Sequence, residues 1–254
     1  MKISPLRAFL VFSVSFFLQS THIDQQNRIP SDIIVFTKTV GFRHKSIPQA
    51  TGAMKALAKR YGYTLIHTED SRIFTPSVLE STKAIVFLLT TGDVIPEAFQ
   101  ANIKNYVEQG GGFVGVHSAS DTEYQWPWYK ELIGTYFKQH PKIQSAIVSR
   151  SEYRHHSSEH LPKQWSHIDE WYNFSNPLPP KILLSVDENT YEGGLMGNIH
   201  PISWCHEIKK GRSWYTALGH TKESYKNPLL LKHLWGGVEY AMGVVVSPCR
   251  RSLQ

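Results

Sequence analysis

The regular alternation of short apolar segments with amphipathic segments over the first half of the chain constrains the fold more than any other feature. Four strands are expected, over 32–37, 63–67, 83–89 and 113–116. Apolar residues at helical spacing predict helices over 47–60 and 96–109, and Thr75-Pro76-Ser77 opens a short helix between the second and third strands. Such alternation is typical of right-handed β-α-β units. The sequence therefore predicts an α/β fold with a mainly parallel central sheet flanked by helices.

The pattern changes after Tyr136. Further strands are expected over 143–149, 182–186, 198–207 and 213–218, separated by polar, histidine-bearing loops. A helix over 227–242 closes the domain. The polar segment 151–166 is too long for a simple hairpin, and loops of that length are more often functional or mobile than filler. We therefore expect one domain over residues 30–243, with an appended, partly antiparallel region in its second half.

The two ends of the chain are set apart from this domain. Lys2 and Arg7 precede the unbroken apolar run 8–18, and small or polar residues follow it, as in a signal peptide over residues 1–20. The run is too short to span a bilayer comfortably, which makes an uncleaved membrane anchor the weaker alternative. The sequence thus predicts a secreted or periplasmic protein, with no stable membrane insertion after cleavage and a flexible tail over 244–254.

Charge and cysteine content exclude two classes of protein. The formal charge of the chain is +6, but it falls to near neutral when the basic residues of the signal segment and the tail are set aside. No basic stripe interleaved with aromatic residues remains, so nucleic acid is not an expected partner. Two cysteines, Cys205 and Cys249, are too few for a disulfide scaffold, although a single bridge between them stays open.

The strongest candidate for a functional site is the run GGGFVGVHSASDT at 110–122. Its glycine-rich turn feeds a short apolar strand that stops at a polar cluster, and open parallel sheets bind ligands beyond the carboxyl ends of their strands. His117, Ser118 and Asp121 are therefore expected at the functional edge of the sheet. The alternative is a strand followed by an Asx-type turn, with a histidine that only satisfies backbone groups.

Arg43 and His44 follow the first strand directly and precede a helix. They are expected at the same edge as His117, near a helix amino terminus that favours anions or polarised oxygens. Taken alone, an arginine and a histidine in such a loop are more often solvated bystanders. Two histidines from neighbouring strand ends are harder to dismiss.

Two adjacent carboxylates, Asp169 and Glu170, stand in an otherwise aromatic and apolar run, where a carboxylate is costly unless it is paired or hydrogen-bonded. Either one anchors the architecture or one works as an acid or base. Adjacent strand residues face opposite sides, so only one of the two is expected to reach the site. His200 and His220 add further histidines at strand ends, and Glu223 follows His220 closely.

Several histidines near carboxylates also raise the question of a metal. The chain has no HExxH or CxxC motif and no pair of these histidines at helical spacing. A mononuclear zinc site built from distant histidines at the sheet edge stays open as an alternative, while the loop pair His155-His156 is expected to be exposed. Nucleophile motifs are missing as well, because the chain has neither GxSxG nor an elbow cysteine.

Five motifs taken together resemble the ThuA-like (trehalose utilisation) family. They are GFRHKSI at 41–47, GGGFVGVHSASDT at 110–122, DEWYNF at 169–174, HPISW at 200–204 and ALGHTKESY at 217–225. The resemblance covers nearly all of the chain after the signal segment and implies a flavodoxin-like α/β fold of the class I glutamine amidotransferase type. In those amidotransferases the strand ends in a nucleophilic cysteine, and the resemblance puts His117 at that position. Without a thiol, glutamine hydrolysis has no nucleophile, which removes amidotransferase chemistry from the prediction.

The family name implies disaccharide catabolism, in which its members look like partners of oxidoreductases that form 3-keto sugars. The leading hypothesis is therefore an enzyme that acts on a saccharide or an oxidised saccharide. In this hypothesis His117 and Asp121 form an acid/base pair in which Asp121 fixes the His117 tautomer. His44 is a second proton carrier, and Arg43 orients an oxygen. Further substrate contacts are expected from Ser118, Asp169, Glu170, His200, His220 and Glu223.

Two alternatives stay open. In a non-catalytic carbohydrate-binding protein the tryptophans would stack on the sugar, with Trp126, Trp128 and Trp204 as candidates, and the histidines would only form hydrogen bonds. In a metal-dependent sugar hydrolase or isomerase the edge histidines would bind a divalent metal such as zinc, and no other cofactor is indicated. The sequence leaves the identity of the saccharide undetermined, and a homo-oligomer is among the open options.

Overall fold

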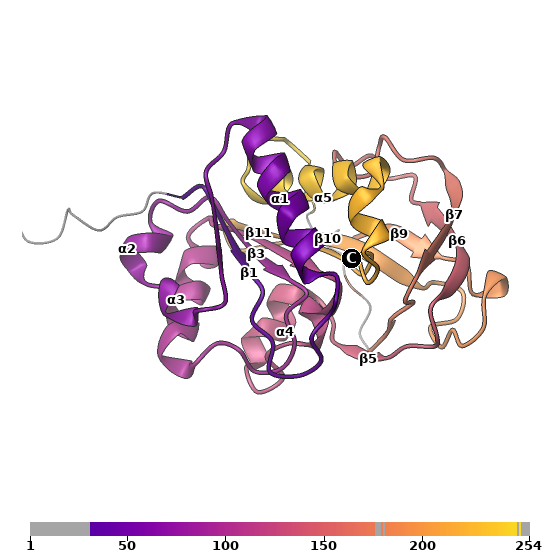
Figure 1. Cartoon of the computed structure of the whole chain (residues 1–254), viewed down its shortest axis with the longest axis horizontal. Helices are drawn as coiled ribbons and strands as arrows, with labels where there is room; N and C mark the ends of the chain where they lie inside the picture. Colours follow the sequence, from indigo (N-terminus) through magenta and orange to yellow (C-terminus); the bar gives the residue numbers. More distant parts are fainter. Residues whose placement is uncertain (1–30, 176–178, 180, 248, 250–254) are drawn as a thin grey trace, which may run out of the picture.

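One mixed sheet runs through the molecule and carries helices on both faces (Figure 1). The computed structural model describes residues 31–175, 179, 181–247 and 249, and nine strands of that part of the chain form the sheet in the order β2-β1-β3-β4-β11-β10-β9-β6-β7. The first five strands in this order pair in parallel, and every later pairing is antiparallel. This confirms the predicted α/β class, with a mainly parallel sheet extended by antiparallel strands.

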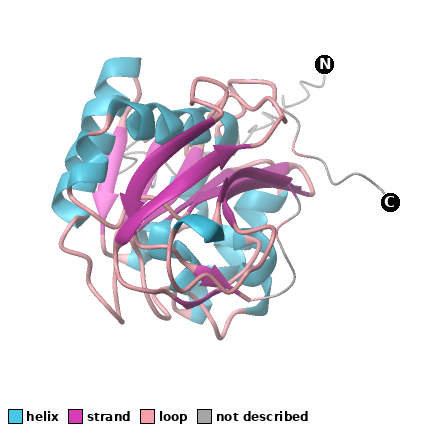
Figure 2. Ribbon diagram, turned by 90° about the vertical axis from the view of Figure 1, so that its right-hand side faces the viewer, coloured by secondary structure: helices cyan, strands magenta, loops and turns pink. Residues whose placement is uncertain are grey.

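The parallel half of the sheet holds the centre of the core. Its strands are β2 (Leu65–Thr68), β1 (Ile33–Phe36), β3 (Ala84–Leu88), β4 (Gly112–Val116) and β11 (Gly211–Thr216). Every residue of β1, β3 and β4 is buried, because helices cover both faces of the sheet. This burial on both faces explains why these strands are almost continuously apolar in sequence. Figure 2 shows the strands as a twisted layer between helices.

The antiparallel half extends the sheet beyond β11. It contains β10 (Pro201–Ile208), β9 (Lys181–Val186), β6 (Gln144–Arg150) and β7 (Gln164–Asp169), and a separate ribbon pairs β5 (Phe137–Gln139) with β8 (Asn173–Phe174). The sequence predicts β11 as part of the partly antiparallel region, and the structure shows that β11 pairs antiparallel with β10 and in parallel with β4. It is therefore the strand at which the two halves join. The predicted long loop ends earlier than expected, because β7 begins at Gln164.

Two helices cover one face of the sheet and three cover the other. In Figure 1, α1 (Ile47–Tyr61) and α5 (Pro228–Ala241) lie above the sheet, while α2 (Pro76–Leu79), α3 (Glu97–Glu108) and α4 (Pro127–Ile133) lie below or beside it. Short 3₁₀ turns complete the chain at η1 (Ser71–Ile73), η2 (His117–Asp121), η3 (Glu188–Thr190) and η4 (Glu223–Lys226). Proline in the first turn and a side-chain cap start α2 and α5, the caps being Thr75 and Asn227.

The predicted signal segment over residues 1–20 and the last residues of the predicted tail, 250–254, lie outside the described residues. Of the helices that the structure describes, none combines the length and the apolar character needed to cross a membrane. Within the segment expected to be a flexible tail, Cys249 is buried and forms a disulfide with Cys205 of β10. The single bridge that the sequence left open is therefore present and ties the end of the chain to the sheet.

The glycines at the start of β4 are required by close packing. A Cβ atom at Gly112 would collide with the carbonyl oxygen of Ala241 in α5, and one at Gly111 would collide with the ring of Tyr106. We expect Gly112→Ala to destabilise the protein by about 1–3 kcal/mol, because backbone must move to admit the methyl group. Gly52→Ala is the matched control. Gly52 lies within α1 with open space around it, so its replacement should stabilise the helix by about 0.5–1 kcal/mol. Chemical denaturation of both variants checks this contrast.

A buried histidine of α5 makes stability depend on pH. Burial lowers the pKa of His233 to about 3, and its Nδ1 donates to the Ser157 carbonyl at 2.7 Å. His155, which was expected to be exposed, is likewise buried beside Ser157. Because the unfolded chain takes up the proton at pH about 6.5, stability from His233 falls as pH drops from about 6.5 towards 3, by about 1.4 kcal/mol per pH unit.

The measurable consequence lies between pH 7 and pH 5. Over that interval His233 should cost the protein about 2 kcal/mol of stability. In His233→Asn an amide takes over the donor to Ser157 and does not titrate, so the loss of stability on acidification should be smaller by that amount. Denaturant unfolding of both proteins at the two pH values tests it. Equal pH dependence in parent and variant would contradict the assignment.

Candidate functional site

Four side chains from different parts of the chain meet at the carboxyl-terminal edge of the parallel strands. They are His44 (between β1 and α1), His117 (directly after β4), Glu170 (directly after β7) and His220 (between β11 and η4). The ring centroids of the three histidines lie 4.9 to 5.2 Å apart. We call these four residues the histidine cluster. It lies where open parallel sheets bring together residues distant in sequence.

His117 occupies a strained turn between β4 and η2. Its φ of +52° lies in the left-handed region, which is unfavourable for a residue other than glycine. The carbonyl of His117 accepts hydrogen bonds from the hydroxyls of Tyr215 at 2.7 Å and Ser120 at 3.3 Å, which stabilise the turn. Strain of this kind concentrates at functional sites. The resemblance places His117 at the position of the amidotransferase nucleophile. The structure has a sharp turn at this position, but the side chain there is an imidazole and not a thiol.

A hydrogen bond fixes the tautomer of His117. Its Nδ1 lies 2.6 Å from the carbonyl oxygen of Ala217, and because a carbonyl oxygen only accepts, Nδ1 carries the hydrogen. In the neutral ring Nε2 therefore presents its lone pair, 3.2 Å from His220 Nδ1 and 3.5 Å from Glu170 Oε2. Metal-ligating histidines are typically held in this way, with one nitrogen bonded to a carbonyl or carboxylate and the other free to bind the ion.

His44 is buried and neutral. Burial, reinforced by the neighbouring His117 and His220, lowers the pKa of His44 to about 2. Its Nδ1 lies 3.4 Å from the Ser118 hydroxyl, whereas its buried Nε2 has no hydrogen-bond partner among the described residues. A buried nitrogen without a partner costs free energy unless something else binds it. His44 is therefore unsuited to the expected role of a proton carrier near neutral pH and suited to that of a neutral ligand.

The adjacent carboxylates Asp169 and Glu170 point to different places, as strand alternation led us to expect. Glu170 Oε2 lies 3.0 Å from His220 Nδ1. Asp169 is fully buried and accepts hydrogen bonds from the backbone N–H groups of Gly219 and His220, at 2.8 and 3.0 Å. Glu170 thus reaches the cluster, and Asp169 holds the loop that carries His220.

Local charges keep both acids ionised. Burial raises the pKa of Glu170, but the neighbouring imidazoles of His117 and His220 outweigh it, so the pKa of Glu170 lies well below its usual range. Burial also opposes ionisation of Asp169, yet His167 and the backbone N–H groups bring its pKa below the ordinary value. Burial lowers the pKa of His220, but the hydrogen bond and charge of Glu170 raise it overall. The result is an ionised carboxylate among three imidazoles.

The histidine cluster has both the chemistry and the spacing of a metal site. One nitrogen or oxygen atom from each residue lies within 4.8 Å of those from the others. Ligand atoms at 2.0–2.2 Å from a tetrahedral ion lie about 3.4 Å apart. The separations among Glu170 Oε2, His117 Nε2 and His220 Nδ1 are 3.0, 3.2 and 3.5 Å. Imidazoles with one carboxylate suit zinc and neighbouring first-row divalent ions. The residues therefore fit the mononuclear site that the sequence left open.

Several of the predicted site residues lie outside the cluster, among them Arg43, His200 and Glu223. Arg43 pairs with Glu69 at 2.7 Å, and half of its side chain is exposed. His200 is buried and bonded to Glu188 at 2.8 Å, which gives it a structural role between η3 and β10. Glu223 is exposed in η4 and forms no hydrogen bond or ion pair with the cluster. Local partners or solvent account for each of them.

The expected pairing of Asp121 with His117 is wrong. Asp121 Oδ1 accepts a hydrogen bond from the Tyr124 hydroxyl at 2.8 Å, and the Ala217 carbonyl already occupies His117 Nδ1. The sequence predicted that the Asp121 carboxylate fixes the tautomer of His117. In the structure the carbonyl of Ala217, directly after β11, does so instead. Burial raises the pKa of Asp121, although the Tyr124 hydrogen bond and the charge of His117 oppose that effect. Asp121 therefore lies near the cluster without being part of it.

The tryptophans named as candidate sugar platforms are core residues. Trp126, Trp128 and Trp204 are buried, and Trp204 Nε1 donates to the Ile133 carbonyl at 2.8 Å. They cannot stack on a sugar in this structure. Exposed aromatic side chains beside the cluster include Phe42, whose ring centroid lies 4.8 Å from that of His44.

Sequence reasoning missed one histidine of the site. His140 Nδ1 lies 3.2 Å from Glu170 Oε1, the carboxylate oxygen that faces away from the other histidines, and its side chain is 40% exposed. Its ring also stacks on that of Tyr172, with centroids 5.8 Å apart. A lone histidine in a polar loop after a short strand carries no pattern that would mark it. Only the path of the chain between β5 and β6 brings it to the cluster.

Comparison with known proteins identifies the fold and the family. Residues 32–241 match the ThuA family, described as trehalose utilisation. A ThuA-like protein from Bacteroides uniformis is 23% identical, with a TM-score of 0.66 over 84% of this chain and 93% of its own. A ThuA-like protein from Parabacteroides merdae is 18% identical, with a TM-score of 0.69 over 86% of this chain and 92% of its own.

A search of curated proteins gives no match. At these identities the solved structures establish a shared fold and nothing finer. The family match spans every strand of the sheet and the whole histidine cluster. The chain therefore belongs to the ThuA, or trehalose-utilisation, family.

Proposed function

We propose that this protein is a divalent-metal-dependent enzyme of disaccharide use, acting on a saccharide or an oxidised saccharide at the histidine cluster. The observation that carries the proposal is the convergence of three imidazoles and one ionised carboxylate, with their ligand atoms within 4.8 Å of one another. The unpartnered, buried Nε2 of His44 supports it, because an ion would satisfy that nitrogen. The family description, trehalose utilisation, supports a saccharide as the substrate class.

The residues around the cluster divide the work of binding and positioning. His44, His117, Glu170 and His220 would hold the ion, which when bound would polarise a sugar carbonyl or hydroxyl oxygen as a Lewis acid. The Ala217 carbonyl orients His117, and Asp169 orients the backbone of His220. Such outer partners of ligating residues contribute measurably to metal affinity.

His140 is the residue best placed to move a proton. Its Nδ1 faces the Pro141 carbonyl at 2.8 Å and Glu170 Oε1 at 3.2 Å, so this nitrogen carries the hydrogen. The Nε2 atom of the neutral ring is then free to accept a proton from substrate. Partial exposure lets His140 exchange that proton with water, as a general base or acid must. This arrangement replaces the His117–Asp121 pair as the acid/base element of the proposal.

Metal analysis and product analysis together test the proposal. Purified protein is expected to contain a stoichiometric first-row metal, and chelation should abolish turnover that zinc, cobalt or manganese then restores. Trehalose and its 3-keto derivative are the first substrates to incubate, with NMR to detect a new species. Full turnover by metal-free protein would show that the activity does not depend on a metal. Saturable binding of either sugar with no new species, by metal-loaded protein, would reject catalysis in favour of a binding protein.

A further inference from the structure

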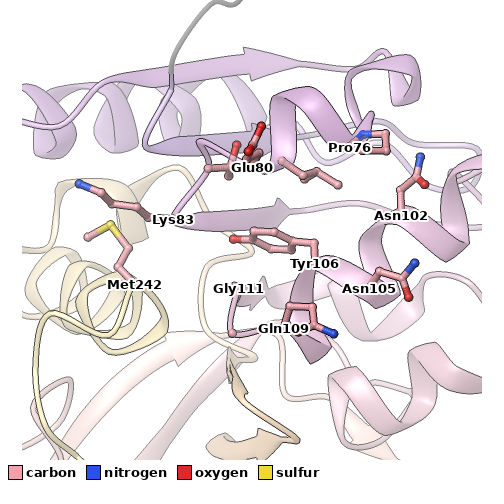
Figure 3. Close-up of a pocket in the computed structure, with 12 residues that line it drawn as sticks. Pro76, Glu80, Lys83, Asn102, Asn105, Tyr106, Gln109, Gly111 and Met242 are labelled. Atoms are coloured by element: carbon pink, nitrogen blue, oxygen red, sulfur yellow. The ribbon is translucent and has the colours of Figure 1, made fainter.

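A cavity of about 520 Å³ lies at the opposite edge of the sheet from the histidine cluster (Figure 3). Lys83 and Gly111 stand immediately before β3 and β4, so the cavity is at the amino ends of the strands whose carboxyl ends carry the cluster. Its remaining walls are α3, the end of α2 and Met242 after α5. The volume falls within the range of small-molecule sites. This cavity is therefore spatially separate from the proposed metal centre.

A fixed aromatic ring stands in the middle of the cavity. Figure 3 shows the Tyr106 ring between Glu80 and Gly111. The Tyr106 hydroxyl accepts from the N–H of Gly112 at 3.1 Å and lies 3.3 Å from its carbonyl oxygen, so the polar end of the side chain is occupied. The absence of a side chain at Gly111 lets the ring pack against the backbone. Tyr106 therefore contributes a rigid, half-buried aromatic ring to the cavity wall. The apolar face of a sugar can pack against such a ring.

Carboxamides line the wall beside this ring. Asn102 and Asn105 lie on α3 and Gln109 follows its last residue, at spacings of three and four residues that put them on one side, next to Tyr106. Asn102 uses its amide nitrogen to bond the Phe74 carbonyl at 2.9 Å, which leaves its oxygen free. The side chains of Asn105 and Gln109 form no hydrogen bond with other described residues. Each amide offers a donor and an acceptor together, which matches the dual character of a hydroxyl group.

The charges around the cavity favour a neutral ligand. Its two charged side chains, Glu80 and Lys83, have opposite signs, and Lys83 is already paired with Asp32 at 2.9 Å. No group of cations is present among the lining residues to bind a phosphate or a carboxylate. Leu79 and Met242 add apolar surface. The lining thus combines an aromatic ring, amide groups with free hydrogen-bonding atoms, and no net charge among its side chains.

We propose that this cavity is a second saccharide-binding site, which takes a neutral mono- or disaccharide on the Tyr106 ring with its hydroxyls bonded to Asn102, Asn105 and Gln109. The site is independent of the metal centre and of the chemistry proposed there. It would hold a sugar on the protein without transforming it.

Calorimetric titration of the purified, metal-loaded protein with trehalose and with maltose tests this proposal. The double variant Asn105→Ala/Gln109→Ala should weaken binding about tenfold, because each neutral hydrogen bond contributes about 0.5–1.5 kcal/mol. Both residues are exposed, Asn105 on α3 and Gln109 directly after it, so the variant should fold normally. Asn198→Ala is the matched control, since Asn198 is an exposed asparagine that lines a different cavity. It should bind as the parent does.

A third variant separates this site from the histidine cluster. Glu170→Gln alters the metal centre and leaves the α3 cavity intact, so the binding assigned to the cavity should persist in it. Binding lost in Glu170→Gln but unchanged in Asn105→Ala/Gln109→Ala would place the sugar at the cluster and overturn the second site. Absence of saturable binding of both disaccharides would overturn it as well, whether or not the protein proves to be a metal enzyme.

Discussion

The Glu170→Gln variant is expected to lose stoichiometric metal binding, with affinity reduced by more than about a hundredfold, above the range that changes outside the ligand set produce. Glutamine has nearly the same shape but no charge, and Glu170 is the carboxylate that approaches both His117 and His220. Three imidazoles without an anionic ligand neutralise none of the charge of a divalent ion. Turnover should fall with the metal. Titration against a competing chelator, with elemental analysis of the purified protein, gives the affinity and the stoichiometry.

Two further substitutions make this prediction specific. Asp169→Asn leaves every proposed ligand in place but weakens the acceptor that holds the backbone of Gly219 and His220, so metal affinity should fall by about 10–100-fold. Glu223→Gln makes the same chemical change as Glu170→Gln at an exposed position and should have no effect. Unaltered metal affinity in Glu170→Gln would remove this residue from the ligand set, and with it the proposed centre.

Removing the disulfide is expected to cost about 4 kcal/mol of folding stability, because the bridge closes a loop between residues 44 apart in sequence and so restricts the unfolded chain. Cys249→Ala breaks the bond with a small change in side-chain volume. Guanidinium unfolding of parent and variant measures the difference. Since Cys205 lies in β10, outside the histidine cluster, metal content should stay at the parent level.

A reductant provides the internal control for the disulfide. Unfolding of the parent protein in the presence of a thiol reductant should reproduce the loss seen in Cys249→Ala, whereas the variant should not respond to it. Equal stability of the oxidised parent and the variant would contradict the prediction. It would mean that opening the loop does not increase the conformational entropy of the unfolded chain.

Much of the fold was predictable because strand and helix periodicity is a local property. The segments 32–37 and 83–89 were predicted as strands and form β1 and β3, within a residue or two at each end. The parallel pairing of β11 with β4 could not be predicted from the sequence, for a physical reason. Its residues are strand-forming in either orientation, and only its position between β4 and β10 makes one pairing parallel and the other antiparallel.

The candidate site was predictable only in part. His117 and His44 follow buried parallel strands, so their arrival at one edge could be inferred. Asp121 was assigned to His117 because it is near in sequence, but the backbone carbonyl of Ala217, directly after β11, makes that contact. Every residue has a backbone carbonyl, so the sequence does not show which carbonyl will accept a given hydrogen bond. His140 was missed for a related reason, since its role depends on where the loop after β5 happens to pass.

The run GGGFVGVHSASDT at 110–122 shows which properties the sequence determined and which depended on the tertiary structure. The sequence by itself determined that a buried strand ends in a histidine at the functional edge, because an apolar run and a polar cluster are visible without coordinates. The tertiary structure alone decided that this histidine belongs with His44, Glu170 and His220, that a carbonyl fixes its tautomer, and that the glycines serve the packing of α5 and Tyr106. The physical reason is that metal-ligand geometry and close packing depend on distances between residues remote in the chain, which the folding of the whole sheet sets.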